Sequence, residues 1–183
     1  MMKVLDIGCG KKKYVSNNPE DTVIGMDHYS GDGVDVVHDL EVFPWPFAGG
    51  EFDLVIANHV LEHLPDLIAT MEEIWRVGRD GSLVSVRVPY FSFPGSFQDP
   101  THKRFFTRRT FDYFLPRVEF NYYSPARFEL VSRRLVTFAK HPRLSAGFDA
   151  LINLFPRFYE RFFAYIFPAE NLFVELKVTK TAR

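Results

Sequence analysis

A short apolar run that breaks into two glycines, Leu5-Asp6-Ile7-Gly8-Cys9-Gly10, constrains the fold of this chain more than any other stretch. Residues 3–7 predict a buried strand, and Gly-x-Gly then lets the backbone turn sharply and lie close to a ligand where a Cβ would obstruct it. A tight turn without a ligand explains such a fragment about equally well. The third glycine of a full Gly-x-Gly-x-x-Gly is replaced by Lys13.

A second apolar run favours the ligand-binding interpretation. Residues 23–27 end in Asp27, which lies 19 positions after Gly8. A carboxylate at the end of the second strand of a dinucleotide-type fold accepts hydrogen bonds from ribose hydroxyls. The two runs together therefore predict an α/β protein that binds a nucleoside.

Length, charge and cysteine content narrow the class of protein. A chain of 183 residues can bury the core of a single domain, and we expect one domain over residues 1–183. The formal charge of −1 gives no electrostatic case for general nucleic-acid binding. Cys9 is the single cysteine, and the sequence contains neither a signal peptide nor a run of about 18 apolar residues. These features predict a cytoplasmic protein.

The remaining pattern predicts a mostly parallel sheet whose first crossover helices are shortened. Residues 11–21 and 27–34 are turn-rich and lack helical spacing. Further strands are expected at 34–38, 52–57 and 83–88, a helix at 65–77, and two alternating strands at 128–138 and 172–179.

The segment after the strand at 52–57 allows two interpretations. His59-x-x-Glu62-His63 matches a metalloprotease pattern in which two histidines one helical turn apart bind zinc. Pro65, however, suits the first turn of a new helix better than the continuation of an old one. The same residues, directly after a buried strand, suit a cofactor pocket. We therefore expect no metal.

The order of these pieces resembles one family. The motifs are Asp6-Ile7-Gly8-Cys9-Gly10, Asp27, His38-Asp39-Leu40, Phe52-Asp53-Leu54-Val55 and Val60-Leu61-Glu62-His63-Leu64, followed by a helix leading to Gly81. They are similar to those of class I S-adenosylmethionine-dependent methyltransferases, specifically the type 11 group. The resemblance implies a Rossmann-like sheet of seven strands, with an antiparallel last strand and S-adenosylmethionine lying across the strand ends.

The resemblance also implies roles for individual residues. The loop formed by Asp6, Gly8, Cys9 and Gly10 would lie alongside the methionine moiety, and Asp27 would bind the ribose hydroxyls. Asp39 and Leu40 would meet the adenine, while Asn58 and His59 would line the pocket near the methyl group. The chain departs from the family pattern at Lys12, which stands where a third glycine is usual, and in lacking a helix before the first strand.

Methyl transfer is an in-line displacement, so the protein must chiefly align donor and acceptor and exclude water. A base is needed only when the acceptor must lose a proton, as a hydroxyl does. Candidates follow the fourth and fifth strands, and they are His59, His63, Tyr90, Asp99 and His102. We predict that His102 and His59 act in catalysis on a sugar or other small polar acceptor. The alternative is a noncatalytic domain of the same fold that binds S-adenosylmethionine as a sensor or scaffold.

An aromatic segment separates the last two expected strands. Residues 142–169 predict two helices divided by Pro156, with apolar residues on more than one stripe. Such a pair could pack in the core, cap the active site, form a dimer contact or lie on a membrane surface through residues 144–167. Because Asp149 and Glu160 accompany Arg157 and Arg161, the sequence predicts weak attraction to anionic lipid.

Overall fold

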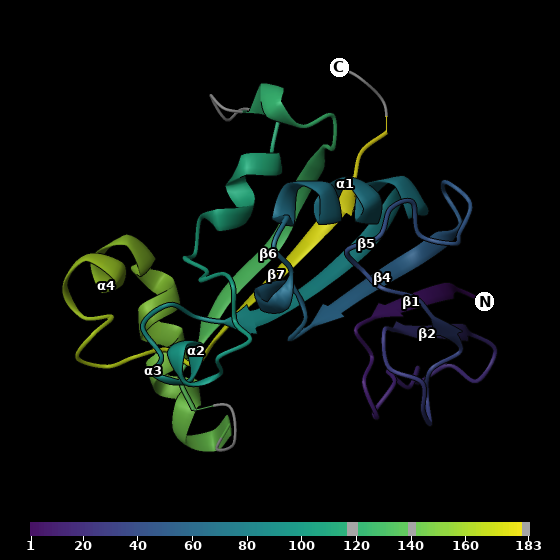
Figure 1. Cartoon of the computed structure of the whole chain (residues 1–183). Helices are drawn as coiled ribbons and strands as arrows, with labels where there is room; N and C mark the ends of the chain where they lie inside the picture. The colour runs from purple at the N-terminus through teal and green to yellow at the C-terminus, as the bar shows by residue number, and fades with distance from the viewer. Residues whose placement is uncertain (117–120, 139–141, 181–183) are drawn as a thin grey trace.

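The computed structural model describes residues 1–116, 121–138 and 142–180. These residues form a seven-stranded sheet in the order β3-β2-β1-β4-β5-β7-β6 (Figure 1). The strands are β1 (Lys3–Ile7), β2 (Thr22–Asp27), β3 (Val36–Val37), β4 (Phe52–Asn58), β5 (Gly78–Pro89), β6 (Phe128–Val136) and β7 (Asn171–Val178). β1 to β5 are paired in parallel, and β7 runs antiparallel to both β5 and β6. The predicted Rossmann-like architecture is confirmed.

The helices are few and short for an α/β fold. They are α1 (Leu67–Val77), α2 (Gly95–Gln98), α3 (Pro142–Leu154) and α4 (Pro156–Phe162), together with the 3₁₀ turns η1 (Leu61–His63), η2 (Thr110–Phe114) and η3 (Asn121–Tyr123). The segments that join β1 to β2 and β2 to β3 contain turns and bends in place of helices. The prediction of shortened crossovers is therefore confirmed. Among the described residues, no helix is long and apolar enough to cross a membrane.

α1 is the helix that packs on the centre of the sheet (Figure 1). The Asp66 side chain caps it by accepting a hydrogen bond from the Ala69 amide at 2.9 Å, so the helix begins two residues later than Pro65 suggested. Its buried residues recur at helical spacing, and Gly78 ends it. β5 begins at Gly78, five residues earlier than predicted, because Gly78 already pairs with Phe52 of β4.

One face of the sheet is open over β5 and β7. Val84, Val86 and Val88 are buried, whereas the alternate residues Leu83, Ser85 and Arg87 are accessible. β7 shows the same alternation, with Glu175 and Lys177 exposed. Successive side chains of a strand point to opposite faces, so this part of the sheet is covered on one side only.

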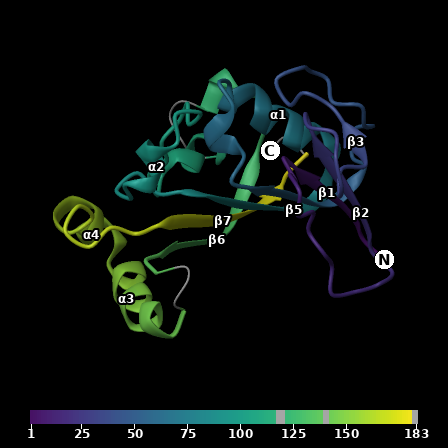
Figure 2. The same ribbon diagram turned by 60° about the horizontal axis from the view of Figure 1, so that its bottom comes forward.

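α3 and α4 extend beyond the sheet at the end of the molecule opposite β2 (Figure 2). Pro156 divides the two helices as predicted. The core-packing alternative is wrong for most of their apolar side chains, because Leu154, Phe155 and Phe158 are 68%, 59% and 57% exposed. Ile152 and Tyr159 are the exceptions and anchor the pair to the core.

Candidate functional site

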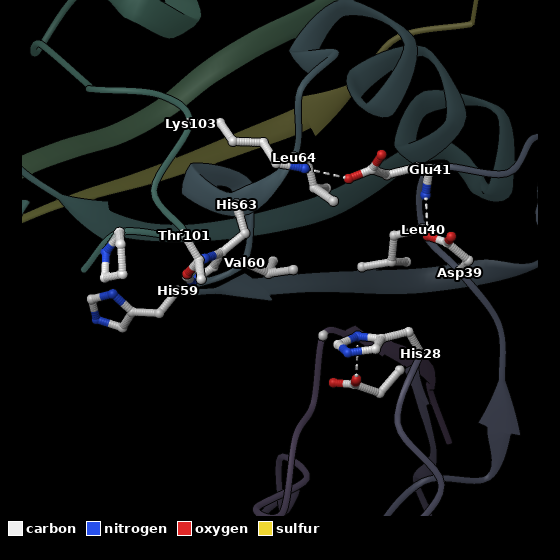
Figure 3. A pocket seen from close by; sticks show the side chains of 13 residues that line it. His28, Asp39, Leu40, Glu41, His59, Val60, His63, Leu64, Thr101 and Lys103 are labelled. Carbon is white, nitrogen blue, oxygen red and sulfur yellow. Dashed lines mark hydrogen bonds and ion pairs between the residues drawn. The ribbon is translucent and has the colours of Figure 1, made fainter.

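A cavity of about 720 Å³ lies where β1, β2 and β4 end (Figure 3). Ligands of open α/β sheets bind at this carboxyl edge. The lining residues come from the end of β2, from the segments that follow β1 to β4 and from the loop after α2. They are Gly8, Asp27, His28, Asp39, Leu40, Glu41, His59, Val60, His63, Leu64, Pro100, Thr101 and Lys103.

Gly8 forms the floor of the cavity and needs to be glycine for two reasons. Its φ is +63°, a conformation that side chains rarely adopt. A Cβ at this position would lie 2.3 Å from Cγ2 of Val60, the residue that crosses behind the loop. The Gly8 amide donates to the Met26 carbonyl at 2.8 Å, which ties the end of β1 to β2. The backbone is therefore bare where a ligand would approach.

Asp27 ends β2 and lies in the wall of the cavity, 7% exposed. Its Oδ2 accepts a hydrogen bond from the Gly10 amide at 2.9 Å, and its Oδ1 accepts from the Tyr29 amide at 3.1 Å. These bonds fix the carboxylate, and an ionised carboxylate has about four acceptor positions. His28 Nδ1 also lies 3.1 Å from Oδ1, so capacity for at least one ribose hydroxyl remains.

The loop after β3 forms another wall. Asp39, Leu40 and Glu41 line the cavity, and Trp45 holds the loop by donating from Nε1 to the Leu40 carbonyl at 3.2 Å. Lys103 reaches Glu41 across the cavity at 2.7 Å (Figure 3). In the same view His28 lies on the opposite side of the cavity from Leu40. A planar group between Leu40 and His28 would have an apolar and an aromatic neighbour.

His59 follows β4 with a φ of +54°, a backbone conformation that residues other than glycine rarely adopt. The surrounding structure must hold it there. The His59 amide donates to the Arg87 carbonyl at 2.8 Å, and His59 Nδ1 lies 3.1 Å from Oε1 of the buried Glu62. His59 precedes η1 and does not share a helix with His63. The helical zinc pair suggested by His59-x-x-Glu62-His63 is therefore excluded by the backbone.

His63 and Thr101 bound the cavity at the end away from Asp39. Thr101 Oγ1 lies 2.9 Å from His63 Nδ1 and donates to Asp99 Oδ1 at 2.6 Å. Asp99 also accepts from the Thr101 amide, and these hydrogen bonds hold the pKa of its carboxyl below the usual value. Asp99 thus organises the loop that closes this end.

His102 and Tyr90, both expected near the acceptor, do not line the cavity. His102 packs edge-on against His63 with ring centroids 4.8 Å apart, and its Nδ1 lies 2.8 Å from the Ser96 carbonyl. The chain turns at Asp99 and buries this side chain behind His63. Tyr90 is fully buried and donates its hydroxyl to Glu160 at 2.7 Å. Burial raises the pKa of the Tyr90 hydroxyl, so the tyrosinate that would act as a base is scarcely populated at neutral pH.

Asp6, Cys9, Gly10 and Asn58 were expected to meet the cofactor, but the structure does not place them in the lining. Asp6 accepts from the Tyr14 amide at 2.7 Å, and burial raises the pKa of its carboxyl. Burial, with Asp6 and Asp27 nearby, raises the pKa of the Cys9 thiol to about 11. Asp6, Cys9 and Gly10 shape the loop from behind, while the exposed Asn58 ends β4.

Of the predicted cofactor residues, the structure brings five together in the lining of one cavity, namely Gly8, Asp27, Asp39, Leu40 and His59. Sequence reasoning missed His28, Glu41 and Lys103 as lining residues. His28 could have been found, because it follows Asp27 directly. The Lys103–Glu41 pair could not, because its partners lie 62 residues apart and no local pattern joins them.

Comparisons with known proteins agree with this geometry. A family model described as a methyltransferase domain matches residues 1–128. No curated protein matches the sequence. Among solved structures, a SAM-dependent methyltransferase from Archaeoglobus fulgidus is similar at 17% identity and a TM-score of 0.56, with 96% of this chain and 85% of that chain covered.

Two further structures show how widely the fold is used. The YcgJ protein from Bacillus subtilis is similar at 13% identity and a TM-score of 0.59, with 99% of this chain and 93% of that chain covered. The [4+2]-cyclase SpnF is similar at 14% identity and a TM-score of 0.58, with 97% and 74% covered. These likenesses confirm the fold, and the match over residues 1–128 decides the family. The chain belongs to the methyltransferase domain family, and S-adenosylmethionine is the cofactor that this membership implies.

Proposed function

We propose that this enzyme binds S-adenosylmethionine in the cavity at the strand ends and transfers its methyl group to a hydroxyl of a sugar or another small polar acceptor. The observation that carries the proposal is the position of Asp27. Its fixed carboxylate borders the same cavity as the bare backbone of Gly8 and the wall formed by Asp39 and Leu40. The ribose of S-adenosylmethionine joins its methionine chain to its adenine, and these three surfaces offer one neighbour to each part.

The cavity continues from the cofactor wall to an acceptor end bounded by His59, His63 and Thr101. Its polar lining suits an acceptor with hydroxyl groups, which can exchange hydrogen bonds with imidazole and threonine. In the reaction an acceptor oxygen bonds to the methyl carbon as the carbon–sulfur bond breaks, and S-adenosylhomocysteine leaves. His59 borders the space where this oxygen would lie and could receive its proton.

Calorimetry with S-adenosylmethionine tests the cofactor assignment. Losing one charge-assisted hydrogen bond of about 1.5–3 kcal/mol in Asp27→Ala should lower the affinity by roughly 10- to 150-fold. Asp32→Ala is the matched control, since Asp32 is an exposed acid outside the cavity lining. A folded Asp27→Ala variant with wild-type affinity would refute the assignment. Tight binding without turnover on any acceptor would instead support the sensor alternative.

We also propose that the aromatic face of α3 and α4 rests on an anionic membrane surface. Phe148, Leu151, Phe155, Phe158 and Phe163 belong to the eight apolar residues that line a groove of about 300 Å³ on this face. Such an exposed apolar surface is unusual for a protein that works alone in water.

The charges of the two helices support a lipid surface more strongly than the sequence indicated. Asp149 accepts hydrogen bonds from the amide and hydroxyl of Thr137, and Glu160 accepts from Tyr90 and from the Arg108 amide. Both acids are thus engaged with the protein, whereas Arg157 and Arg161 are exposed. Exposed cations beside exposed aromatic rings fit an anionic headgroup layer. We also propose a cytoplasmic location, which the single cysteine of the sequence supports.

A further inference from the structure

Three potential metal ligands meet beside the acceptor end of the cavity, and His63 is the one among them that lines it. Glu62 and His63 come from η1, and His102 comes from the loop that follows α2. Each offers one ligand atom, and the three atoms lie within 4.8 Å of one another. This trio differs from His59-x-x-Glu62-His63, because His102, 39 residues further along the chain, takes the place of His59.

Hydrogen bonds fix the tautomers of both histidines. The Ser96 carbonyl can only accept, so His102 Nδ1, 2.8 Å away, must carry the proton. The Thr101 hydroxyl donates a hydrogen bond to Asp99 at 2.6 Å. The Thr101 oxygen therefore accepts a hydrogen bond from His63 Nδ1. Each ring therefore keeps a lone pair on Nε2. Metal-bound histidines are oriented in this way, with the other ring nitrogen donating to a carbonyl or, through a hydroxyl, to a carboxylate.

Glu62 supplies an independent observation. It is 1% exposed, and its Oε1 is paired with His59. Its Oε2 is also buried and has no hydrogen-bond partner among the described residues. A buried carboxylate oxygen without a partner is unfavourable, and each such case needs an explanation. A cation bound by this oxygen and by the Nε2 atoms of the two imidazoles provides one, and the Asp99 carboxylate, 3.9 Å from His102 Nε2, adds negative charge beside it.

The backbone holds the trio together without a ligand. The amides of Lys103 and Arg104 both donate to the Glu62 carbonyl, at 2.8 and 3.1 Å. The loop that carries His102 is thereby fixed against η1. A preformed arrangement of ligands does not have to be ordered when the ion binds.

We infer that Glu62, His63 and His102 form a binding site for a divalent transition metal of the zinc type. Two imidazoles and one carboxylate are a donor set that zinc accepts, and a site with three protein ligands keeps a fourth position open. This inference departs from the expectation of no metal, which rested on Pro65 and on the position of the motif directly after a buried strand.

The open position gives the site a role in the reaction. His63 lines the cavity, so a ligand at the fourth position would lie at its acceptor end. An acceptor hydroxyl bound there would release its proton to His59 more readily, and its oxygen would then attack the methyl carbon. This role depends on the proposed function, whereas metal binding itself does not.

Metal binding can be tested without any methyl acceptor. Tag-free protein is dialysed against micromolar zinc chloride and analysed for bound metal, and cobalt(II) is used as a spectroscopic probe. We expect one ion per chain in the wild type and in the control His38→Ala, whose ring bonds the Val42 carbonyl outside the cluster. Glu62→Gln, His63→Ala and His102→Ala should each weaken binding by at least about tenfold.

The three variants keep the test decisive if one of them does not fold. A wild type that retains no stoichiometric zinc or cobalt would overturn the inference, as would any folded variant of the trio that binds metal as tightly as the wild type. Calorimetry with S-adenosylmethionine on metal-free protein separates the two proposals. Loss of cofactor binding there would contradict the proposed function and leave the metal site standing.

Discussion

The two ends of this molecule use their side chains in opposite ways. At the strand ends of β1, β2 and β4, short loops place polar groups around a cavity and fix nearly each one by a backbone hydrogen bond, as Asp27 shows. At the far end, α3 and α4 present aromatic rings to solvent with few such constraints. The first region is built to hold a polar molecule in one orientation, and the second presents an adaptable apolar surface.

The two regions differ in which of their segments form helices. The crossover segments before β4 lack helices, and the polar loops took over the task of positioning the ligand. Glycine, the Pro-Trp-Pro segment and the buried Trp45 give these loops rigidity. Apolar residues instead form the helical pair α3 and α4 between β6 and β7. One face of β5 and β7 stays uncovered.

The largest expected effect is a loss of methylation rate after a substitution at the polar end. His102→Ala should lower the methylation rate by about 10²–10⁴-fold, the range lost with a general base or a metal ligand at the acceptor. Affinity for S-adenosylmethionine should stay nearly unchanged, because His102 does not line the cavity. Turnover, cofactor affinity and melting temperature are measured on the same variant. A lower melting temperature with unchanged turnover would reduce His102 to a structural role in the Asp99 turn.

The second test asks how tightly the glycine loop is closed. Alkylation by iodoacetamide proceeds through the thiolate. Burial first, and then Asp6 and Asp27, raise the pKa of the Cys9 thiol from 9.0 to about 11. At pH 8 the thiolate fraction is therefore about 100-fold lower than for an ordinary cysteine, and the rate should rise about tenfold per pH unit up to pH 11. A rate at pH 8 equal to that of a cysteine in an unfolded peptide would show that the loop is open.

The third test addresses the apolar end. Phe155 is 59% exposed, and the loss of its insertion should cost roughly 1–2 kcal/mol, or about tenfold in partitioning onto vesicles with anionic lipid. Phe155→Ser is compared with Val131→Ser, which changes a similarly exposed apolar residue on β6. Sedimentation with vesicles of neutral and of anionic lipid measures the effect. Equal binding by both variants would refute the membrane contact, and a wild-type dimer dissociated by Phe155→Ser would assign the face to a second copy.

The smallest expected effect concerns the joint between the two ends. The Tyr90 hydroxyl donates to Glu160 of α4 at 2.7 Å, and the Arg108 amide donates to the same oxygen. Tyr90→Phe removes one of these bonds and should cost about 1–2 kcal/mol of unfolding free energy, a fall of roughly 2–8 °C in melting temperature. Cofactor affinity should not change. A loss of cofactor affinity in this variant would show that the two ends are coupled.

The sequence predicted the parts of the site that depend on neighbours along the chain. Gly8 and Asp27 follow directly from the ends of two apolar runs, and the seven-stranded sheet with an antiparallel last strand follows from the family resemblance. Positions set by long-range packing escaped prediction. His102 was expected in the cavity, but the path of the loop after Asp99 turns it behind His63. The exposure of Phe155 escaped as well, because an apolar stripe has the same pattern whether it meets a core, a partner or a membrane.

A crystal structure of the complex with S-adenosylhomocysteine tests the central claim most directly. The account predicts that the ribose hydroxyls lie within hydrogen-bond distance of the Asp27 carboxylate, about 2.6–3.0 Å. The adenine should lie beside Leu40 and the sulfur should face His59. A nucleoside bound away from Asp27, for example in the apolar groove of α3 and α4, would contradict it.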